Sequence, residues 1–128
     1  MARGEQQHPV VLVVDDEAAI RLLCRVNLEL EGYEVLEAAT LSAARDRLSE
    51  ESVRLVLLDL HVGNERGETL LLELLEREPR IPVIVVTGSS EVDTGELNLP
   101  ADAILAKPFT IEALLETVAA LTAHDHAR

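Results

Sequence analysis

Three aspartates in this sequence stand where a metal ion could bind. Asp15 and Asp16 follow directly after the apolar run Val10 to Val14, and Asp59 follows directly after the run Val53 to Leu58. Runs that are apolar at nearly every position are typical of parallel strands buried on both faces, and ligands bind beyond the carboxyl ends of such strands. Carboxylates at one sheet edge repel one another and raise one another's pKa unless a cation lies among them. Because Mg²⁺ prefers carboxylate and water oxygens, we expect Mg²⁺ at this cluster.

A simpler interpretation exists for the first two of these aspartates. Asp15 and Asp16 could be a turn and a helix N-cap, positions at which aspartate is common. Asp59 favours the metal site, because it places a third carboxylate at the same predicted edge.

Two further strand ends carry groups that suit a phosphoryl ligand. Thr87, with Gly88 after it, closes one apolar run and offers a hydroxyl and accessible N–H groups, and Lys107 closes another and offers a positive charge. Each residue alone has an ordinary structural explanation. Because Mg²⁺ usually keeps positions open for phosphate oxygens, the set as a whole favours a phosphorylated ligand or a phosphorylated side chain.

The composition limits the classes of partner. The formal net charge is −13, from 24 acidic and 11 basic side chains, which argues against extended contact with nucleic acid or an anionic membrane. Cys24 is the only cysteine, so no internal disulfide can form, and a reducing compartment fits. Residues 1–9 lack the apolar core of a signal peptide, and no stretch is apolar enough to span a bilayer. We therefore expect a cytoplasmic protein that binds neither nucleic acid nor membrane.

The elements that position these residues alternate along the chain. Segments with helical spacing of apolar residues separate five predicted strands, and this alternation predicts an α/β fold. The most uniformly apolar strands belong in the centre, so we expect a doubly wound five-stranded parallel sheet of order 2-1-3-4-5 with helices on both faces. The predicted strands are 10–14, 33–36, 53–58, 81–86 and 103–106, and the clearest helical segments are 20–28, 41–48, 68–77 and 110–121.

The fourth helix is the weakest element of this prediction. It must lie between Gly88 and Asp102, and Gly95 and Pro100 within that segment predict a short or irregular helix. The domain itself is expected over residues 9–123, with an N-terminal tail at 1–8 and a C-terminal tail at 124–128.

Four short motifs, in this order and spacing, resemble the receiver domains of two-component response regulators. The motifs are VVDDE at 13–17, LLDL at 57–60, VVTG at 85–88 and AKPF at 106–109. The resemblance covers Pro9 to about Ala123. It implies a stand-alone regulatory phosphoacceptor domain of CheY-like fold, not an enzyme, that undergoes only Mg²⁺-dependent self-phosphorylation and self-dephosphorylation.

The resemblance also implies a role for each site residue. Asp59 would accept a phosphoryl group from a sensor histidine kinase, a phosphotransfer protein or a small acyl phosphate. Asp16 and Asp59 would bind Mg²⁺ directly, Asp15 would bind it through water, and the backbone carbonyl of His61 would complete the protein ligands. Lys107 and the Thr87 hydroxyl would contact the phosphoryl oxygens, and the peptide bond between Lys107 and Pro108 would be cis.

The sequence departs from the family pattern at the switch that reports phosphorylation. Family members usually carry Tyr or Phe where this chain has Ile104. Isoleucine has no ring to turn between buried and exposed positions, so signalling to the unknown downstream protein is expected to differ from the usual coupling of threonine and aromatic residue. A second departure is an apolar stripe on the first helix, Leu22, Val26 and Leu30, which is either ordinary surface leucine or a docking or homodimer surface.

Two alternatives to a phosphorylation switch stay open at this point. A receiver-like interaction module would keep the fold without being phosphorylated, and intact Asp59, Thr87 and Lys107 count against it. A Mg²⁺-dependent phosphohydrolase would carry its nucleophile and a second carboxylate at alternating positions of the first strand, whereas Asp15 and Asp16 are adjacent.

Overall fold

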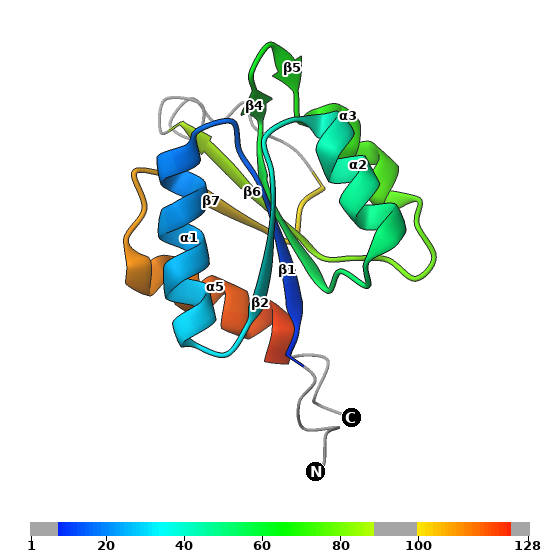
Figure 1. Ribbon diagram of the computed structural model, residues 1–128. Coiled ribbons are helices and arrows are strands. Elements are labelled where there is room, and N and C mark those ends of the chain that lie inside the picture. The colour runs from blue at the N-terminus through cyan, green and yellow to red at the C-terminus, as the bar shows by residue number, and fades with distance from the viewer. Residues whose placement is uncertain (1–7, 89–99, 124–128) are drawn as a thin grey trace.

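The computed structural model describes residues 8–88 and 100–123, which form one twisted sheet with helices on both sides (Figure 1). The sheet has five parallel strands in the order β2-β1-β3-β6-β7. Counted in chain order within this sheet, that is 2-1-3-4-5, so the predicted fold class is confirmed. The strands are β1 (Val10–Val14), β2 (Glu34–Ala38), β3 (Leu55–Asp59), β6 (Val83–Gly88) and β7 (Ala103–Lys107).

Four helices form the outer layers of the described chain. Two of them, α1 and α5, cover one face of the sheet, and α2 and α3 cover the other (Figure 1). Thr40 caps α2, because its side chain accepts a hydrogen bond from the Ala43 N–H at 3.0 Å. The four helices are α1 (Ala18–Leu30), α2 (Leu41–Glu50), α3 (Glu68–Leu75) and α5 (Ile111–Ala123).

The alternation of side chains along the strands explains why the strands are apolar at every position. In β1, Val11 and Val13 lie in the core under α1 and α5, while Leu12 and Val14 lie in the core under α2 and α3. The central strands are therefore buried on both faces. Leu55 and Leu57 of β3 lie in the core under α1 and α5. Asp59 comes two residues after Leu57, so the same alternation places its side chain on this side of the sheet.

Some predicted boundaries differ from the structure. The second strand starts at Glu34 and continues to Ala38, beyond the predicted end, and α3 ends at Leu75. In the first helix, Cys24 and Leu28 are buried, whereas Leu23 is 40% exposed. The segment expected to hold the fourth helix lies mostly outside the described residues.

A short antiparallel hairpin, not predicted from the sequence, follows β3. It pairs β4 (His61–Val62) with β5 (Glu65–Arg66), and Gly63 takes a positive φ of 62° at the turn between them. Among the described residues, no helix combines the length and apolar character needed to cross a bilayer.

Candidate functional site

The three predicted aspartates lie together at the carboxyl edge of the sheet. Asp59 is the last residue of β3, and Asp15 and Asp16 follow β1, the neighbouring strand. One carboxylate oxygen from each lies within 4.8 Å of the others. Asp15 and Asp59 are buried, at 2% and 7% exposure, whereas Asp16 is exposed.

Lys107, the only lysine of the chain, joins the two buried aspartates. Its Nζ lies 3.1 Å from Asp59 Oδ2 and 3.2 Å from Asp15 Oδ2. The exposed carboxylate of Glu17 lies 3.4 Å from the same Nζ. The second oxygen of each buried carboxylate accepts a backbone hydrogen bond, Asp59 Oδ1 from the His61 N–H at 3.1 Å and Asp15 Oδ1 from the Glu17 N–H at 2.9 Å.

The pKa shifts follow from this crowding of charge. Burial raises the pKa of Asp15, and the charge of Asp59 raises it further, against the lowering effects of the Glu17 N–H and Lys107. Burial alone would lower the pKa of Lys107, but its hydrogen bonds and ion pairs with Asp59 and Asp15 outweigh burial and raise it above its ordinary value. Lys107 therefore stays charged at neutral pH, whereas the surroundings of Asp15 disfavour the ionised form of its carboxyl group.

The remaining predicted residues lie around this cluster. Thr87 is buried at the end of β6, directly after Val86, which pairs with Asp59 across the sheet. The Lys107–Pro108 peptide bond is cis. His61 is exposed on the hairpin, and Ile104 on β7 is 42% exposed. The role of the His61 carbonyl as a metal ligand stays a prediction.

Gly67, which was not predicted from the sequence, supports the site. Its N–H donates to the Leu60 carbonyl at 2.7 Å. A Cβ at this position would collide with the backbone carbonyl oxygen of Asp59 and lie 3.0 Å from the Cα of Leu60. Only glycine therefore lets the start of α3 approach the backbone of the aspartate so closely. A glycine eight residues after a strand-end aspartate, at the start of a helical pattern, was the available signal.

Cys24 does not add a nucleophile to the site. Its side chain is 2% exposed, and burial together with the charge of Asp15 raises the pKa of the thiol to about 11. The thiol therefore stays protonated at neutral pH.

The donor set fits a hard divalent cation. Three carboxylate oxygens lie within 4.8 Å of one another, two of them on buried side chains that repel each other, and this arrangement gains from a bound cation. Lys107 supplies only one positive charge to this group. A metal ion of the Mg²⁺ type would be held by Asp15, Asp16 and Asp59.

Known proteins resemble the chain over nearly its whole described length. A family model for the response regulator receiver domain matches residues 11–119. A crystal structure of a CheY-like response regulator receiver domain protein from Methanospirillum hungatei matches with a TM-score of 0.78 and 34% sequence identity, covering 89% of this chain and 93% of that one.

Two curated relatives are larger proteins. The chain is 36% identical over 118 residues to a probable transcriptional regulator, ycf27, of Porphyridium aerugineum, covering 88% of this chain and 48% of that protein. It is 36% identical over 106 residues to the alginate biosynthesis transcriptional regulatory protein AlgB of Pseudomonas aeruginosa, covering 81% of this chain and 24% of that protein. The chain thus spans less than half the length of either relative.

Proposed function

The chain belongs to the response regulator receiver domain family, and on that premise we propose that it is a phosphorylation switch whose phosphoacceptor is Asp59. The observation that carries the proposal is the environment of this carboxylate. Asp59 is buried, its Oδ2 lies 3.1 Å from the only lysine of the chain, and it shares a possible metal site with Asp15 and Asp16. The domain is proposed to extend over residues 9–123.

In the proposed reaction, a carboxylate oxygen of Asp59 attacks the phosphorus of a phosphohistidine. The new P–O bond forms an acyl phosphate while the P–N bond breaks, and the bonding electron pair stays on the departing imidazole nitrogen. Such transfers pass through a loose transition state, so the site mainly positions groups and neutralises charge. The charged Lys107 ammonium, already beside Asp59, moves its hydrogen bonds onto the phosphoryl oxygens.

The Thr87 hydroxyl is proposed to donate to the same phosphoryl group. Asp15, Asp16, Asp59 and the His61 carbonyl would hold Mg²⁺, which, when bound, offsets the negative charge of the transferring phosphoryl oxygens. The acyl phosphate adds about −1.5 to −2 charges and new acceptor oxygens at this sheet edge. Thr87 would respond to these oxygens and bias the surrounding loops.

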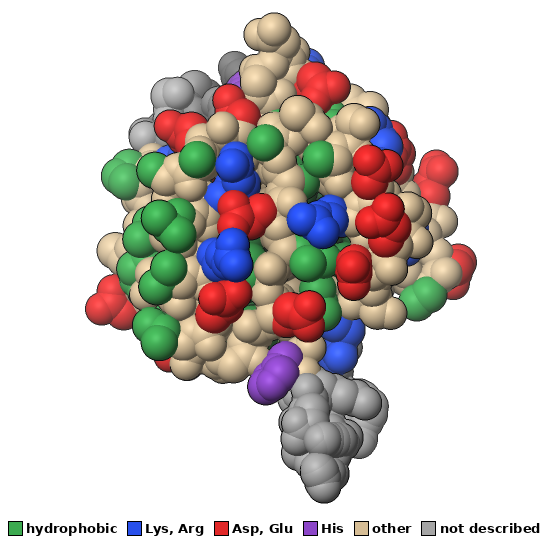
Figure 2. Space-filling view, in the orientation of Figure 1, with side chains coloured by type: hydrophobic (Ala, Val, Ile, Leu, Met, Phe, Trp, Pro, Cys, Tyr) green, Lys and Arg blue, Asp and Glu red, His purple; other side chains and the backbone are tan. Residues whose placement is uncertain are grey.

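The partners follow from the same proposal. The phosphoryl donor would be a sensor histidine kinase or a phosphotransfer protein in the cytoplasm, and a further protein would detect the phosphorylated state. Leu22, Val26 and Leu30 are exposed by 58%, 47% and 77% on α1, and hydrophobic side chains gather on the flank that α1 forms (Figure 2). If this stripe is a docking or dimer surface, an L22E/L30E double variant should lose phosphoryl transfer from its kinase or lose self-association.

Intact mass spectrometry tests the proposed function. Incubation with acetyl phosphate and Mg²⁺ should add one phosphoryl mass to the wild-type chain and none to an Asp59→Ala variant. An Asp46→Ala variant is the matched control, because Asp46 is exposed on α2 and does not belong to the aspartate cluster. An unmodified wild-type chain would favour the interaction module, and turnover of a generic phosphate ester would favour the phosphohydrolase.

A further inference from the structure

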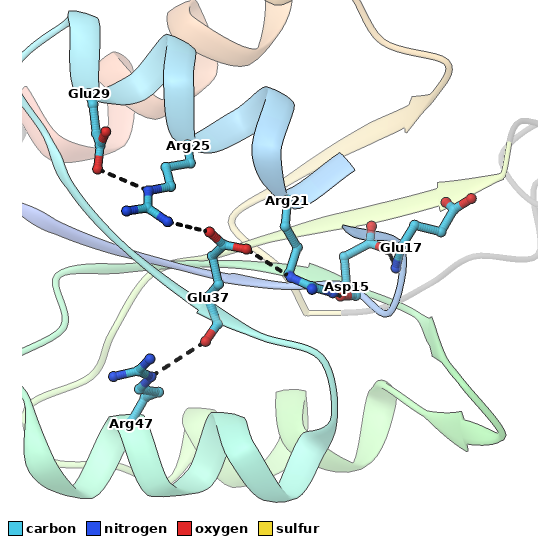
Figure 3. Close-up of polar contacts among 7 residues, drawn as sticks. All are labelled: Asp15, Glu17, Arg21, Arg25, Glu29, Glu37 and Arg47. Atoms are coloured by element: carbon cyan, nitrogen blue, oxygen red, sulfur yellow. Dashed lines mark hydrogen bonds and ion pairs between the residues drawn. The ribbon is translucent and has the colours of Figure 1, made fainter. Parts of the chain in front are cut away.

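Arg21 connects the aspartate cluster to the edge strand of the sheet. It lies in the first turn of α1, just after Asp15, Asp16 and Glu17, and its side chain is 17% exposed. Its Nη1 donates to the backbone carbonyl of Asp15 at 2.7 Å, and its Nε donates to Glu37 Oε1 at 2.9 Å. One guanidinium thus bonds a main-chain oxygen of the site and a carboxylate of β2 (Figure 3).

Glu37 is itself held in place. It pairs with Val13 across the β1–β2 ladder, and its side chain lies between two arginines of α1 (Figure 3). The second of these, Arg25, donates from Nη1 to Glu37 Oε2 at 2.9 Å and also bonds Glu29 at 3.3 Å. Burial would raise the pKa of Glu37, but the hydrogen bonds from Arg25 and Arg21 outweigh it and lower the pKa, so this carboxylate stays ionised at neutral pH.

The carbonyl that Arg21 binds belongs to the peptide group between the two neighbouring aspartates. Because that group is planar, a hydrogen bond to the Asp15 oxygen also orients the N–H and Cα of Asp16. The N–H of Asp15 bonds the Ala38 carbonyl at 3.1 Å. Both main-chain groups of Asp15 are therefore tied to β2, the N–H directly and the carbonyl through Arg21 and Glu37.

We propose that Arg21, held by Glu37, is a positioning residue that fixes the peptide plane between Asp15 and Asp16 and so sets the geometry of the Mg²⁺ site. The inference rests on the proposed function, since it concerns the metal site that phosphorylation of Asp59 would use. Arg21 itself touches neither the proposed metal ligand atoms nor the phosphoryl group; it acts through the backbone that carries them.

The sign of the effect separates positioning from simple electrostatics. A positive charge near a cation site weakens cation binding, so its removal alone would tighten Mg²⁺ binding. Loss of positioning weakens Mg²⁺ binding instead. Arg25 is the matched control, because it lies on the same helix and bonds the same glutamate, and its replacement removes the same charge without touching the Asp15 carbonyl.

Calorimetric titration of the full chain with Mg²⁺, in the absence of a phosphoryl donor, tests the proposal. Arg21→Gln should raise the Kd for Mg²⁺ about tenfold, in the range seen when outer-sphere partners of metal ligands are removed. Arg25→Gln should leave it within about twofold. Glu37→Ala should also weaken binding, and the R21Q/E37A double variant should be no weaker than R21Q, because both residues act through one hydrogen bond.

A second readout is independent of metal binding. In metal-free protein, the backbone amide NMR signal of Asp16 should shift in R21Q and stay in place in R25Q, since of these two arginines Arg21 bonds the carbonyl of that peptide group and Arg25 bonds Glu37 and Glu29 instead. If R21Q does not give the wild-type circular dichroism spectrum, Arg21→Lys replaces it as the test variant. One ammonium retains the charge but lacks the fork that reaches both acceptors, so it too should weaken Mg²⁺ binding.

The outcomes distinguish this inference from the proposed function. Wild-type chain that binds Mg²⁺ and is phosphorylated on Asp59, with unchanged or tighter Mg²⁺ binding in R21Q or R21K, overturns the positioning role alone. Wild-type chain that binds no Mg²⁺ and accepts no phosphoryl group overturns both. Weaker binding in R21Q with an unaltered R25Q supports the positioning role.

Discussion

The Nζ of Lys107 lies 3.1 Å from Oδ2 of Asp59, so the proposed phosphoacceptor is paired with a cation that reaches it from the far edge strand of the sheet. The strand order explains the pairing: β6 lies between β3 and β7, and a long lysine side chain spans that gap along the carboxyl edge. The same ammonium contacts Asp15, so a single side chain offsets the repulsion between two buried carboxylates.

Replacement of Lys107 should slow phosphorylation while leaving the fold intact. Lys107→Met keeps most of the aliphatic stem and removes the charge that meets the phosphoryl oxygens. We expect the rate with acetyl phosphate to fall about a hundredfold, the size of effect seen for a lost electrostatic contact in other active sites. Time-resolved intact mass measures the rate, and a K107M rate within twofold of wild type would remove Lys107 from the proposed mechanism.

Asp15 should destabilise the metal-free protein at neutral pH. Burial and the charge of Asp59 raise its pKa above the ordinary 3.8, so the folded state binds this proton more tightly than the unfolded state. The stability from this group is therefore complete below pH 3.8 and is lost as the pH rises through the raised pKa. In chelator at pH 7, Asp15→Asn should raise the Tm by about 4 °C, a shift that corresponds to roughly 1 kcal/mol.

Added Mg²⁺ provides the control for Asp15. The ion should raise the Tm of wild-type protein, whose carboxylates repel one another, and should raise that of D15N much less. A D15N protein that melts at or below the wild-type temperature in chelator at pH 7 would contradict this account of the cluster.

Glu37 should show the opposite dependence on pH. Its pKa is lowered below the ordinary 4.5, because the hydrogen bonds from Arg25 and Arg21 outweigh the effect of burial. Its contribution to stability is then complete above pH 4.5 and is lost as the pH falls through the lowered pKa. Glu37→Gln should lower the free energy of unfolding by about 1 kcal/mol at pH 7, and the difference should shrink below pH 4.

Glu34 is the matched control for this pH dependence. It lies exposed at the start of the same strand, so Glu34→Gln should stay within about 0.5 kcal/mol of wild type. Denaturant unfolding at pH 7 and pH 3 measures both variants. An E37Q defect of equal size at the two pH values would show that charge on Glu37 is not what stabilises the network.

Gly67 should tolerate no side chain. In Gly67→Ala, the new Cβ meets the backbone of Asp59 and Leu60, which cannot move aside as a flexible side chain would. We expect a loss of about 2 kcal/mol in the free energy of unfolding, together with slower phosphorylation, because the backbone of the phosphoacceptor must shift. Gly63→Ala is the comparison variant, because it introduces backbone strain without a collision.

Gly63 takes a positive φ of 62° in open space, so its replacement should cost only about 1 kcal/mol and leave the phosphorylation rate unchanged. Equilibrium unfolding and the acetyl phosphate reaction compare the two variants. Equal rates of phosphorylation in G67A and G63A would argue against a role for Gly67 in shaping the site.

The parts of the site that sequence reasoning could predict are those that continue an apolar run. Asp59 and Lys107 end buried strands, and parallel strands carry their carboxyl ends to one edge, so their meeting follows from the fold class. The strand order could be predicted from how uniformly apolar each run is, because the most apolar strands belong in the centre of the sheet.

The parts that could not be predicted depend on contacts between surfaces. Arg21 is an ordinary solvated arginine by its place on a helix, and Glu37 is an ordinary polar residue of an edge strand. Only the packing of α1 against β2 brings the two together beside the Asp15 carbonyl. The close approach of Gly67 to Asp59 likewise depends on how the hairpin returns the chain to the sheet edge.

Reductive trapping of the phosphorylated residue tests the central claim most directly. Borohydride reduces an aspartyl phosphate to homoserine, and peptide mapping then identifies the residue that was modified. After reaction with acetyl phosphate and Mg²⁺, we predict homoserine at position 59 and unchanged aspartate at positions 15 and 16. Homoserine at position 15 or 16, or none at position 59 in a chain that has gained a phosphoryl mass, would contradict the assignment of Asp59 as the phosphoacceptor.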